Sequence, residues 1–116
     1  MSSEECIFCK IVAGEIPSDG VFSDDLVTAF RDINPVAPTH ILIVPNEHIE
    51  SPNELTRNHE KLTARMLAVV PKLARQEGIA ESGYRLILNS GPDGRQEVPH
   101  LHLHLLGGQR MKHPMG

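Results

Sequence analysis

The chain has 116 residues, a formal net charge of −4 at pH 7 and 40% hydrophobic residues. This length and composition predict one soluble globular domain over residues 1–116, and no apolar run is long enough to cross a membrane. Without clustered lysine and arginine, nucleic acid is excluded as the main partner, although a mononucleotide needs only a local pocket. The acidic N-terminus lacks the layout of a signal peptide, so we expect a reducing, cytoplasmic location.

The first half of the chain predicts a short helix followed by three strands. Apolar residues recur at helical spacing over residues 6–13, and Gly14 follows as a stop signal. Asp24 and Asp25 predict a hairpin turn between the first two strands, and residues 34–38 predict a loop because they contain two prolines. The predicted strands are residues 20–23, 26–31 and 40–44.

The second half predicts one long helix and a further strand. Residues from about 56 to 77 carry an apolar stripe at helical spacing and end at Gly78, a typical C-terminal cap. Pro71 lies inside this segment, so we expect a kink or an early end there. Residues 84–89 predict a strand, and residues 90–94 form a tight glycine-containing loop after it.

The most informative segment is residues 100–106, where histidines alternate with leucines. Successive side chains of a strand point to opposite faces, so His100, His102 and His104 are expected on one face and the leucines on the other, toward a core. Together with the preceding elements, this predicts an α+β fold with a small antiparallel sheet and one main helix.

Three interpretations of the histidine row compete. Solvated surface histidines or a purification tag fit poorly, because tags are contiguous and these histidines alternate with core leucines. A metal cluster is a stronger alternative, since imidazole is a common ligand. The third interpretation is attack on phosphorus, because a neutral imidazole is both a good nucleophile and a good leaving group and needs no Mg²⁺. The loop at 90–94 would then offer backbone N–H groups to a phosphate, and Asn89 an orienting amide.

Four stretches of the chain together resemble the histidine triad (HIT) superfamily, and within it the Hint-like nucleoside phosphoramidate hydrolase branch. The stretches are CIFCKIVAGEIPS at 6–18, FRDINPVAPTHILIVPNEHI at 30–49, YRLILNSGPDG at 84–94 and QEVPHLHLHLLGG at 96–108. The resemblance implies the HIT fold: a five-stranded antiparallel sheet with one long and one short helix, pairing into a homodimer. It also implies hydrolysis of purine nucleoside 5′-phosphoramidates, such as AMP joined to an amine or to lysine, and of aminoacyl-adenylates.

The resemblance assigns a role to each of four histidines. His102 matches the nucleophile that forms a nucleotidyl-histidine intermediate. His104 matches the residue that contacts the phosphate and helps protonate the leaving group. His100 matches the residue that sets the environment of the nucleophile, and His40 supports the triad from the adjacent strand.

The resemblance also implies a nucleotide site. Asp32 matches the acid that binds both ribose hydroxyls, and its alternative role is to cap its own loop. Asn89 and Gln96 match residues of the phosphate and leaving-group region, where Val98 would offer a backbone amide. The apolar residues that match the purine pocket are Ile7, Phe8, Ile11, Ile16 and Ile33. For Phe8, Ile11 and Ile16 the alternative is ordinary core packing.

A second set of residues has the composition of a closed tetrahedral zinc site. Cys6 and Cys9 form a CxxC motif, and related HIT proteins with this motif use it together with the histidines that match His48 and His100. The implied zinc is structural: it pins the N-terminal segment to the sheet and fixes the ring of His100. The alternative is a pair of buried, reduced cysteines.

The chain departs from the best-studied animal members of the family at three positions. Glu97 stands where those proteins have serine, Arg95 where they have a second glycine, and His113 where a tryptophan is common. A carboxylate would not sit against an anionic phosphate, so we expect Glu97 to face the leaving group and to favour a cationic one. The remaining histidine, His59, is expected to be solvated.

Two other functions are compatible with the residues. A nucleotide-binding sensor or interaction scaffold would bind AMP with negligible turnover. A dinucleoside polyphosphate hydrolase shares the triad, but those enzymes end the motif with a glutamine, whereas residues 105–108 here are Leu-Leu-Gly-Gly, as in the Hint-like branch.

Overall fold

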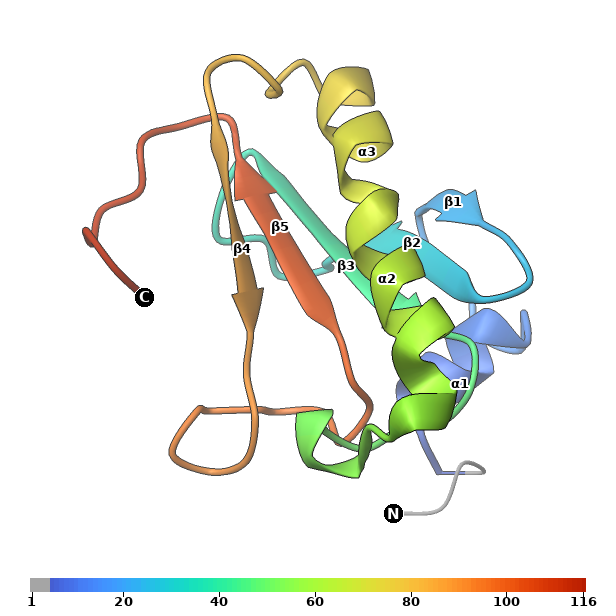
Figure 1. The fold of residues 1–116 in the computed structure, drawn as a ribbon. Helices are drawn as coiled ribbons and strands as arrows, with labels where there is room; N and C mark the ends of the chain where they lie inside the picture. The colour runs from blue at the N-terminus through green and yellow to red at the C-terminus, as the bar shows by residue number, and fades with distance from the viewer. Residues whose placement is uncertain (1–4) are drawn as a thin grey trace.

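Five antiparallel strands form one sheet in the order β1-β2-β3-β5-β4 (Figure 1). The computed structural model describes residues 5–116. The strands are β1 (Gly20–Ser23), β2 (Val27–Arg31), β3 (Thr39–Pro45), β4 (Tyr84–Leu88) and β5 (Leu103–Gly107). The predicted α+β class and five-stranded antiparallel sheet are confirmed, and so is the hairpin turn at Asp24, whose Oδ1 accepts hydrogen bonds from the amides of Leu26 and Val27 at 2.8 Å.

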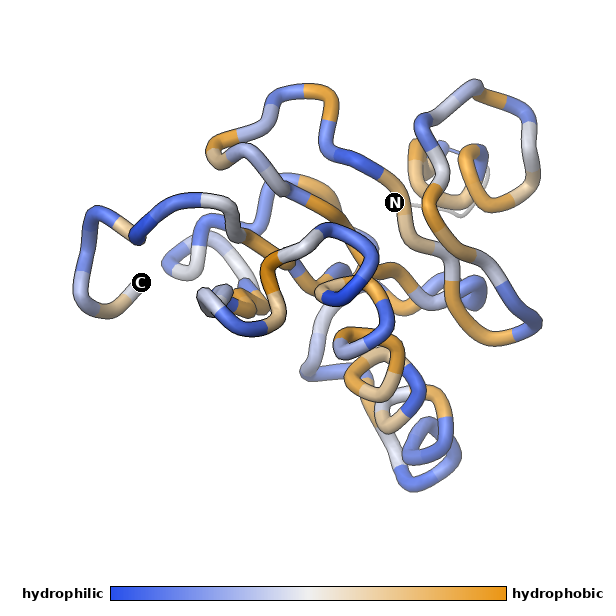
Figure 2. The backbone as a smooth tube through the Cα atoms, turned by 90° about the horizontal axis from the view of Figure 1, so that it is seen from above, coloured by the Kyte–Doolittle hydropathy of each residue, from blue (hydrophilic) through white to orange (hydrophobic). Residues whose placement is uncertain are grey.

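Helices cover both faces of the sheet, which explains why all seven residues of the central strand β3 are buried. Helices α2 (Glu60–Ala68) and α3 (Val70–Gln76) lie across one face (Figure 1) and pack on the core side chains of β2, β3 and β5. Helix α1 (Ile7–Val12) lies on the other face, where the ring of Phe8 packs on Phe30 with 5.4 Å between centroids. In Figure 2, hydrophobic and hydrophilic residues alternate along the α2–α3 segment, as an amphipathic helix on a sheet requires.

The long helix predicted over residues 56–77 is broken into three pieces. A 3₁₀ turn, η2 (Arg57–His59), precedes α2, and α2 ends at Ala68 before α3 begins. Pro71 falls in the first turn of α3, where its missing N–H costs nothing, so the chain starts a new helix at the expected break. A further 3₁₀ turn, η1 (Pro52–Glu54), was not predicted. No helix among the described residues is long and apolar enough to cross a membrane.

The histidine segment alternates as predicted, but its strand is shorter than predicted. Leu101, Leu103 and Leu105 belong to the core under α2 and α3, so the histidines face the α1 side. β5 begins only at Leu103. The reason is that β3 ends at Pro45, which has no N–H for the ladder, and the amide of Leu101 instead donates to the carbonyl of Ile49 at 2.6 Å.

Strand β4 forms one edge of the sheet and, within residues 5–116, pairs only with β5. Its register places Leu86 opposite Leu105 and Leu88 opposite Leu103, on the face that carries α2 and α3. Tyr84, Leu86 and Leu88 are nevertheless 37%, 37% and 46% exposed. The edge of the sheet therefore presents an apolar row beside an unpaired strand backbone.

Candidate active site

The ring of His102 is held in one tautomer by the backbone. Its Nδ1 lies 2.7 Å from the carbonyl oxygen of His100, and a carbonyl can only accept, so Nδ1 carries the proton and Nε2 carries a lone pair. The ring is 6% exposed and packs edge-on against Phe8 of α1, with 5.2 Å between centroids. In its neutral form, His102 therefore presents the lone pair of Nε2.

A hydrogen-bonded chain fixes His104 in the opposite tautomer. The backbone N–H of Val36 donates to Nδ1 of His40 at 3.2 Å, so a neutral His40 carries its proton on Nε2. That Nε2–H lies 2.9 Å from Nδ1 of His104 and 3.4 Å from Oδ2 of Asp32. Nδ1 of His104 accepts, which leaves its Nε2–H as the donor of a ring that lines both cavities.

Burial favours the neutral form of all four histidines at pH 7. It lowers the pKa of His104 to about 4, with further lowering by the nearby His102 and His40 rings, because a second positive charge is disfavoured there. Burial also lowers the pKa of His100 to about 4 and lowers the pKa values of His102 and His40. The neutral rings allow the tautomers described above to persist.

Two cavities meet at these histidines. The apolar cavity, of about 290 Å³, lies between α1 and the sheet. The polar cavity, of about 300 Å³, lies over β4 and β5 and is bounded by Asn89 and Arg95. Residues 90–94, the loop expected to offer backbone N–H groups to a phosphate, line neither cavity. The residues that line both are Asp32, Asn34, Glu97, His102 and His104. This arrangement suits a ligand with an apolar ring at one end, a polar group at the other and its reacting atom at the junction.

Most residues predicted for nucleotide binding line one of the cavities. Asn89 lines the polar cavity, as does Arg95. Asp32 is at the junction, and its Oδ1 also accepts a hydrogen bond from the amide of Asn34 at 2.8 Å, so it caps its loop as well. The predicted residues that line the apolar cavity are Ile7, Phe8, Ile11, Ile16, Ile33 and Val98.

The structure does not bring Gln96 into either cavity. Its side-chain amide donates to the carbonyls of Glu50 at 2.6 Å and Val98 at 3.0 Å, and its Oε1 accepts from the amide of Gly91 at 3.1 Å. These partners satisfy the amide, so Gln96 braces the 90–94 loop from behind and has no free atom for a leaving group.

The predicted zinc ligands converge on one point. Nδ1 of His100 lies 3.2 Å from Sγ of Cys6 and 3.5 Å from Sγ of Cys9, and Nδ1 of His48 lies 3.2 Å from Sγ of Cys9. The two Nδ1 atoms are 3.3 Å apart. Zn–N bonds of about 2.0–2.1 Å and Zn–S bonds of about 2.3 Å give tetrahedral edges of roughly 3.3–3.8 Å, so the four atoms fit the ion closely.

The surroundings orient one of the two histidine ligands toward a metal but not the other. Nε2–H of His100 donates to the carbonyl of Pro45 at 2.9 Å, which turns the lone pair of Nδ1 toward the thiols. Nε2 of His48 is buried and has no such partner within residues 5–116. Burial and the adjacent Cys6 raise the pKa of the Cys9 thiol to about 11, so a metal must displace its proton on binding.

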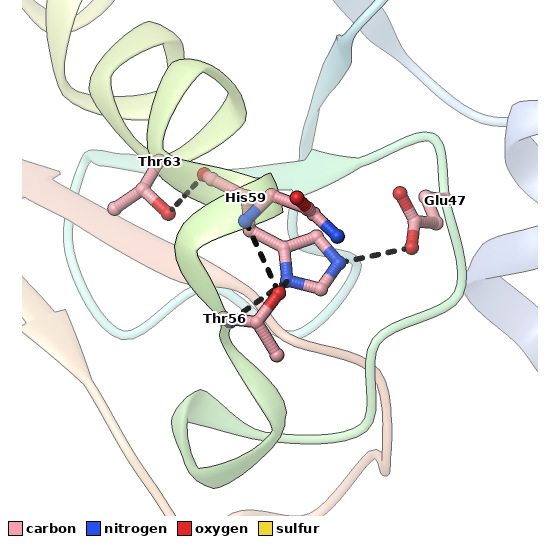
Figure 3. Close-up of polar contacts among 5 residues, drawn as sticks. Glu47, Thr56, His59 and Thr63 are labelled. Carbon is pink, nitrogen blue, oxygen red and sulfur yellow. Dashed lines mark hydrogen bonds and ion pairs between the residues drawn. The ribbon is translucent and has the colours of Figure 1, made fainter.

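His59 is not the solvated residue that the sequence predicted. Its Nδ1 accepts a hydrogen bond from the backbone N–H of Thr56 at 3.0 Å, and its Nε2 lies 3.1 Å from a carboxylate oxygen of Glu47 (Figure 3). Its side chain is 16% exposed. His59 therefore caps the turn before α2 and ties it to the loop after β3, away from both cavities.

Sequence reasoning missed the backbone groups of the site. The amide of Val36 and the carbonyls of His100 and Pro45 set the three tautomers, and no side-chain motif encodes them. It also missed Asn34, which lines both cavities. The only signal for Asn34 was its position two residues after Asp32 in the same loop.

Comparison with known proteins defines the family. The model of the HIT domain family matches residues 13–111, which is most of the chain. The chain belongs to the HIT domain family. In fold it is similar to a HIT family hydrolase from Legionella pneumophila, with a TM-score of 0.93, 51% identity and coverage of 97% of this chain and 100% of that one.

Two curated relatives are similar over nearly their whole length. The purine nucleoside phosphoramidase of Escherichia coli strain K12 is 60% identical over 107 residues, which cover 92% of this chain and 90% of the relative. A 14 kDa zinc-binding protein of Zea mays is 47% identical over 112 residues, which cover 95% of this chain and 87% of the relative.

Proposed function

We propose that the protein is a hydrolase that cleaves the P–N bond of purine nucleoside 5′-phosphoramidates, releasing AMP and an amine. The observation that carries the proposal is the bond from Nδ1–H of His102 to the carbonyl of His100, which presents Nε2 as a nucleophile where the two cavities meet. The similarity to the Escherichia coli phosphoramidase supports the same reaction class.

The reaction proceeds in two displacements at phosphorus. Nε2 of His102 attacks, the P–N bond to the leaving group breaks, and the amine departs with a proton supplied from Nε2–H of His104. Nε2–H of His104 donates to a phosphoryl oxygen and stabilises the charge that builds up there. Water then attacks the nucleotidyl-histidine and gives a proton to Nε2 of His104, which restores the donor. The P–N bond to His102 breaks, which releases AMP and restores the neutral ring.

The two ends of the substrate are held by different parts of the site. The apolar cavity accommodates the purine, and Asp32 at the junction accepts hydrogen bonds from the two ribose hydroxyls. The leaving group occupies the polar cavity with Asn89 and Glu97. Because Glu97 also reaches the junction, it disfavours a second anionic group there and favours leaving groups that carry a cation next to the scissile bond.

The test is release of AMP from an AMP–amine phosphoramidate by the wild type and by His102→Ala, without added metal. We expect the variant to lose at least about 10³-fold in kcat/KM, as for removal of other nucleophiles. His59→Ala, which removes a histidine outside both cavities, is the matched control and should keep the wild-type rate. Tight AMP binding by the wild type without turnover would instead support a nucleotide sensor.

We further propose that Cys6, Cys9, His48 and His100 hold a structural zinc ion. Their mutual distances support it, as does the similarity to a zinc-binding protein of Zea mays. When bound, the ion supplies a rigid crosslink between the N-terminal segment and the histidine strand, and it takes no part in the displacement. Two free thiols in such a cluster fit a reducing compartment such as the cytoplasm.

We also propose a homodimer formed through β4. The unpaired backbone of this edge strand can pair with its copy across a two-fold axis, which would extend the sheet from one subunit into the next. The exposed row of Tyr84, Leu86 and Leu88 would be covered in the same step, together with Leu67 of α2, which is 53% exposed. A second copy suits this row because a two-fold contact makes an apolar patch its own complement.

A further inference from the structure

The loop after β4 holds one residue in a strained conformation. Arg95 has φ of +60°, and it is the only non-glycine residue with positive φ among residues 5–116. Left-handed backbone costs a residue with a Cβ atom about 1 kcal/mol relative to glycine, and such strain is concentrated at functional sites. Nothing in the backbone requires a side chain here, so the side chain itself needs an explanation.

The loop fixes the backbone of Arg95 and leaves its side chain free. The amide of Arg95 donates to the carbonyl of Pro92, and the amide of Gln96 donates to the carbonyl of Gly91, both at 3.0 Å. A Cβ atom on Gly94 would lie 2.6 Å from the carbonyl oxygen of Ser90, so the loop is closed tightly. The guanidinium of Arg95, by contrast, has no hydrogen-bond or ion-pair partner in the described part of the chain.

Arg95 lies away from the place where the phosphate of the substrate would bind. The phosphate must lie where the cavities meet, because His102 and His104 line both. Arg95 lines the polar cavity and not the apolar one, whereas Glu97 lines both. Arg95 therefore faces the part of the ligand that extends beyond the scissile bond, on the side of the leaving group.

We propose that Arg95 is a specificity-determining residue that binds a carboxylate on the leaving group, so that amino acids leave in preference to simple amines. A guanidinium matches a carboxylate with two parallel N–H donors, and a preformed, unpaired arginine loses no other partner on binding. The inference rests on the proposed phosphoramidase function and names the class of leaving group within it.

The experiment compares two leaving groups of the same shape. AMP is joined through nitrogen to β-alanine or to β-alanine amide, and to 6-aminohexanoate or its amide as a longer pair, and kcat/KM is measured for each. We expect the wild type to prefer the carboxylate of at least one pair by about tenfold, the size of one charge-assisted contact. In Arg95→Ala this ratio should fall to about one, and Arg57→Ala, which removes an exposed arginine elsewhere, should keep the wild-type ratio.

The outcomes separate this inference from the proposed function. If the wild type hydrolyses none of the four substrates, the phosphoramidase function fails and the inference fails with it. If the wild type hydrolyses the substrates without preferring either carboxylate, Arg95 does not bind the carboxylate of the leaving group. The same conclusion follows if Arg95→Ala lowers kcat/KM equally for the carboxylate and carboxamide substrates. Arg95→Gly controls for folding: it should lose the preference while melting at or above the wild-type temperature, since glycine relieves the strain.

Discussion

Acidification from pH 7 to pH 5 should destabilise the wild type by about 2 kcal/mol more than a His104→Asn variant. Burial lowers the pKa of His104 from 6.5 to about 4 in the folded protein. In the unfolded chain, His104 therefore binds a proton near pH 6.5, whereas in the folded chain it binds one only near pH 4. The free energy of unfolding falls as the pH falls through this range. Integrated to pH 5, the linkage amounts to about 2 kcal/mol.

Urea unfolding of both proteins at pH 7, 6 and 5 measures this difference. Asparagine retains an acceptor close to the Nδ1 position for the Nε2–H of His40 but does not titrate. Other pH-dependent groups, including the proposed zinc ligands, are present in both proteins, so their contributions to the pH dependence cancel to first order in the double difference. Parallel dependence of the two unfolding free energies on pH would refute a neutral His104, and with it the hydrogen-bonded chain that makes its Nε2–H a donor.

Three further predictions concern the ribose, the metal and the dimer. Asp32→Asn should weaken the binding of AMP about tenfold, measured by calorimetry, and should not change the affinity for 2′,3′-dideoxy-AMP. An equal loss of affinity for both nucleotides would show that Asp32 does not bind the ribose hydroxyls. Cys9→Ser should bind less than the one zinc ion per chain expected of the wild type, measured by atomic absorption, and should melt several degrees lower. A wild-type protein that contains no zinc would contradict this prediction. Leu88→Glu should sediment as a monomer, unlike the wild type; a persisting dimer would place the interface elsewhere.

The faces of the sheet could be predicted from the sequence because alternation is a local property. The leucines of residues 101–105 report which side of the strand meets the core, whatever the partner strand does. The start of the strand could not be predicted in the same way. It depends on Pro45, in a strand more than fifty residues earlier, and on the carbonyl of Ile49 that captures the amide of Leu101.

In the long helical segment, too, the features set by local residues could be predicted, and those set by distant contacts could not. Pro71 predicts a break, and a break occurs. His59 was wrongly expected to be solvated, because the partner that orients its ring is Glu47, twelve residues away on the loop after β3. The buried apolar side chains of this segment were predicted correctly because helical periodicity sets them. The environment of His59 was predicted wrongly because a tertiary contact sets it.

The link between the two halves of the site lies in one residue. His100 turns Nδ1 toward the thiols of Cys6 and Cys9, holds that tautomer through Nε2–H to Pro45, and accepts the Nδ1–H of His102 with its carbonyl. The ring of His100 is part of the Cys/His cluster, and its carbonyl holds the ring of His102. The proposed zinc ion on that ring would fix where the carbonyl of His100 points, so loss of the ion should lower the rate through the orientation of His102 without changing the chemistry of the proposed displacement.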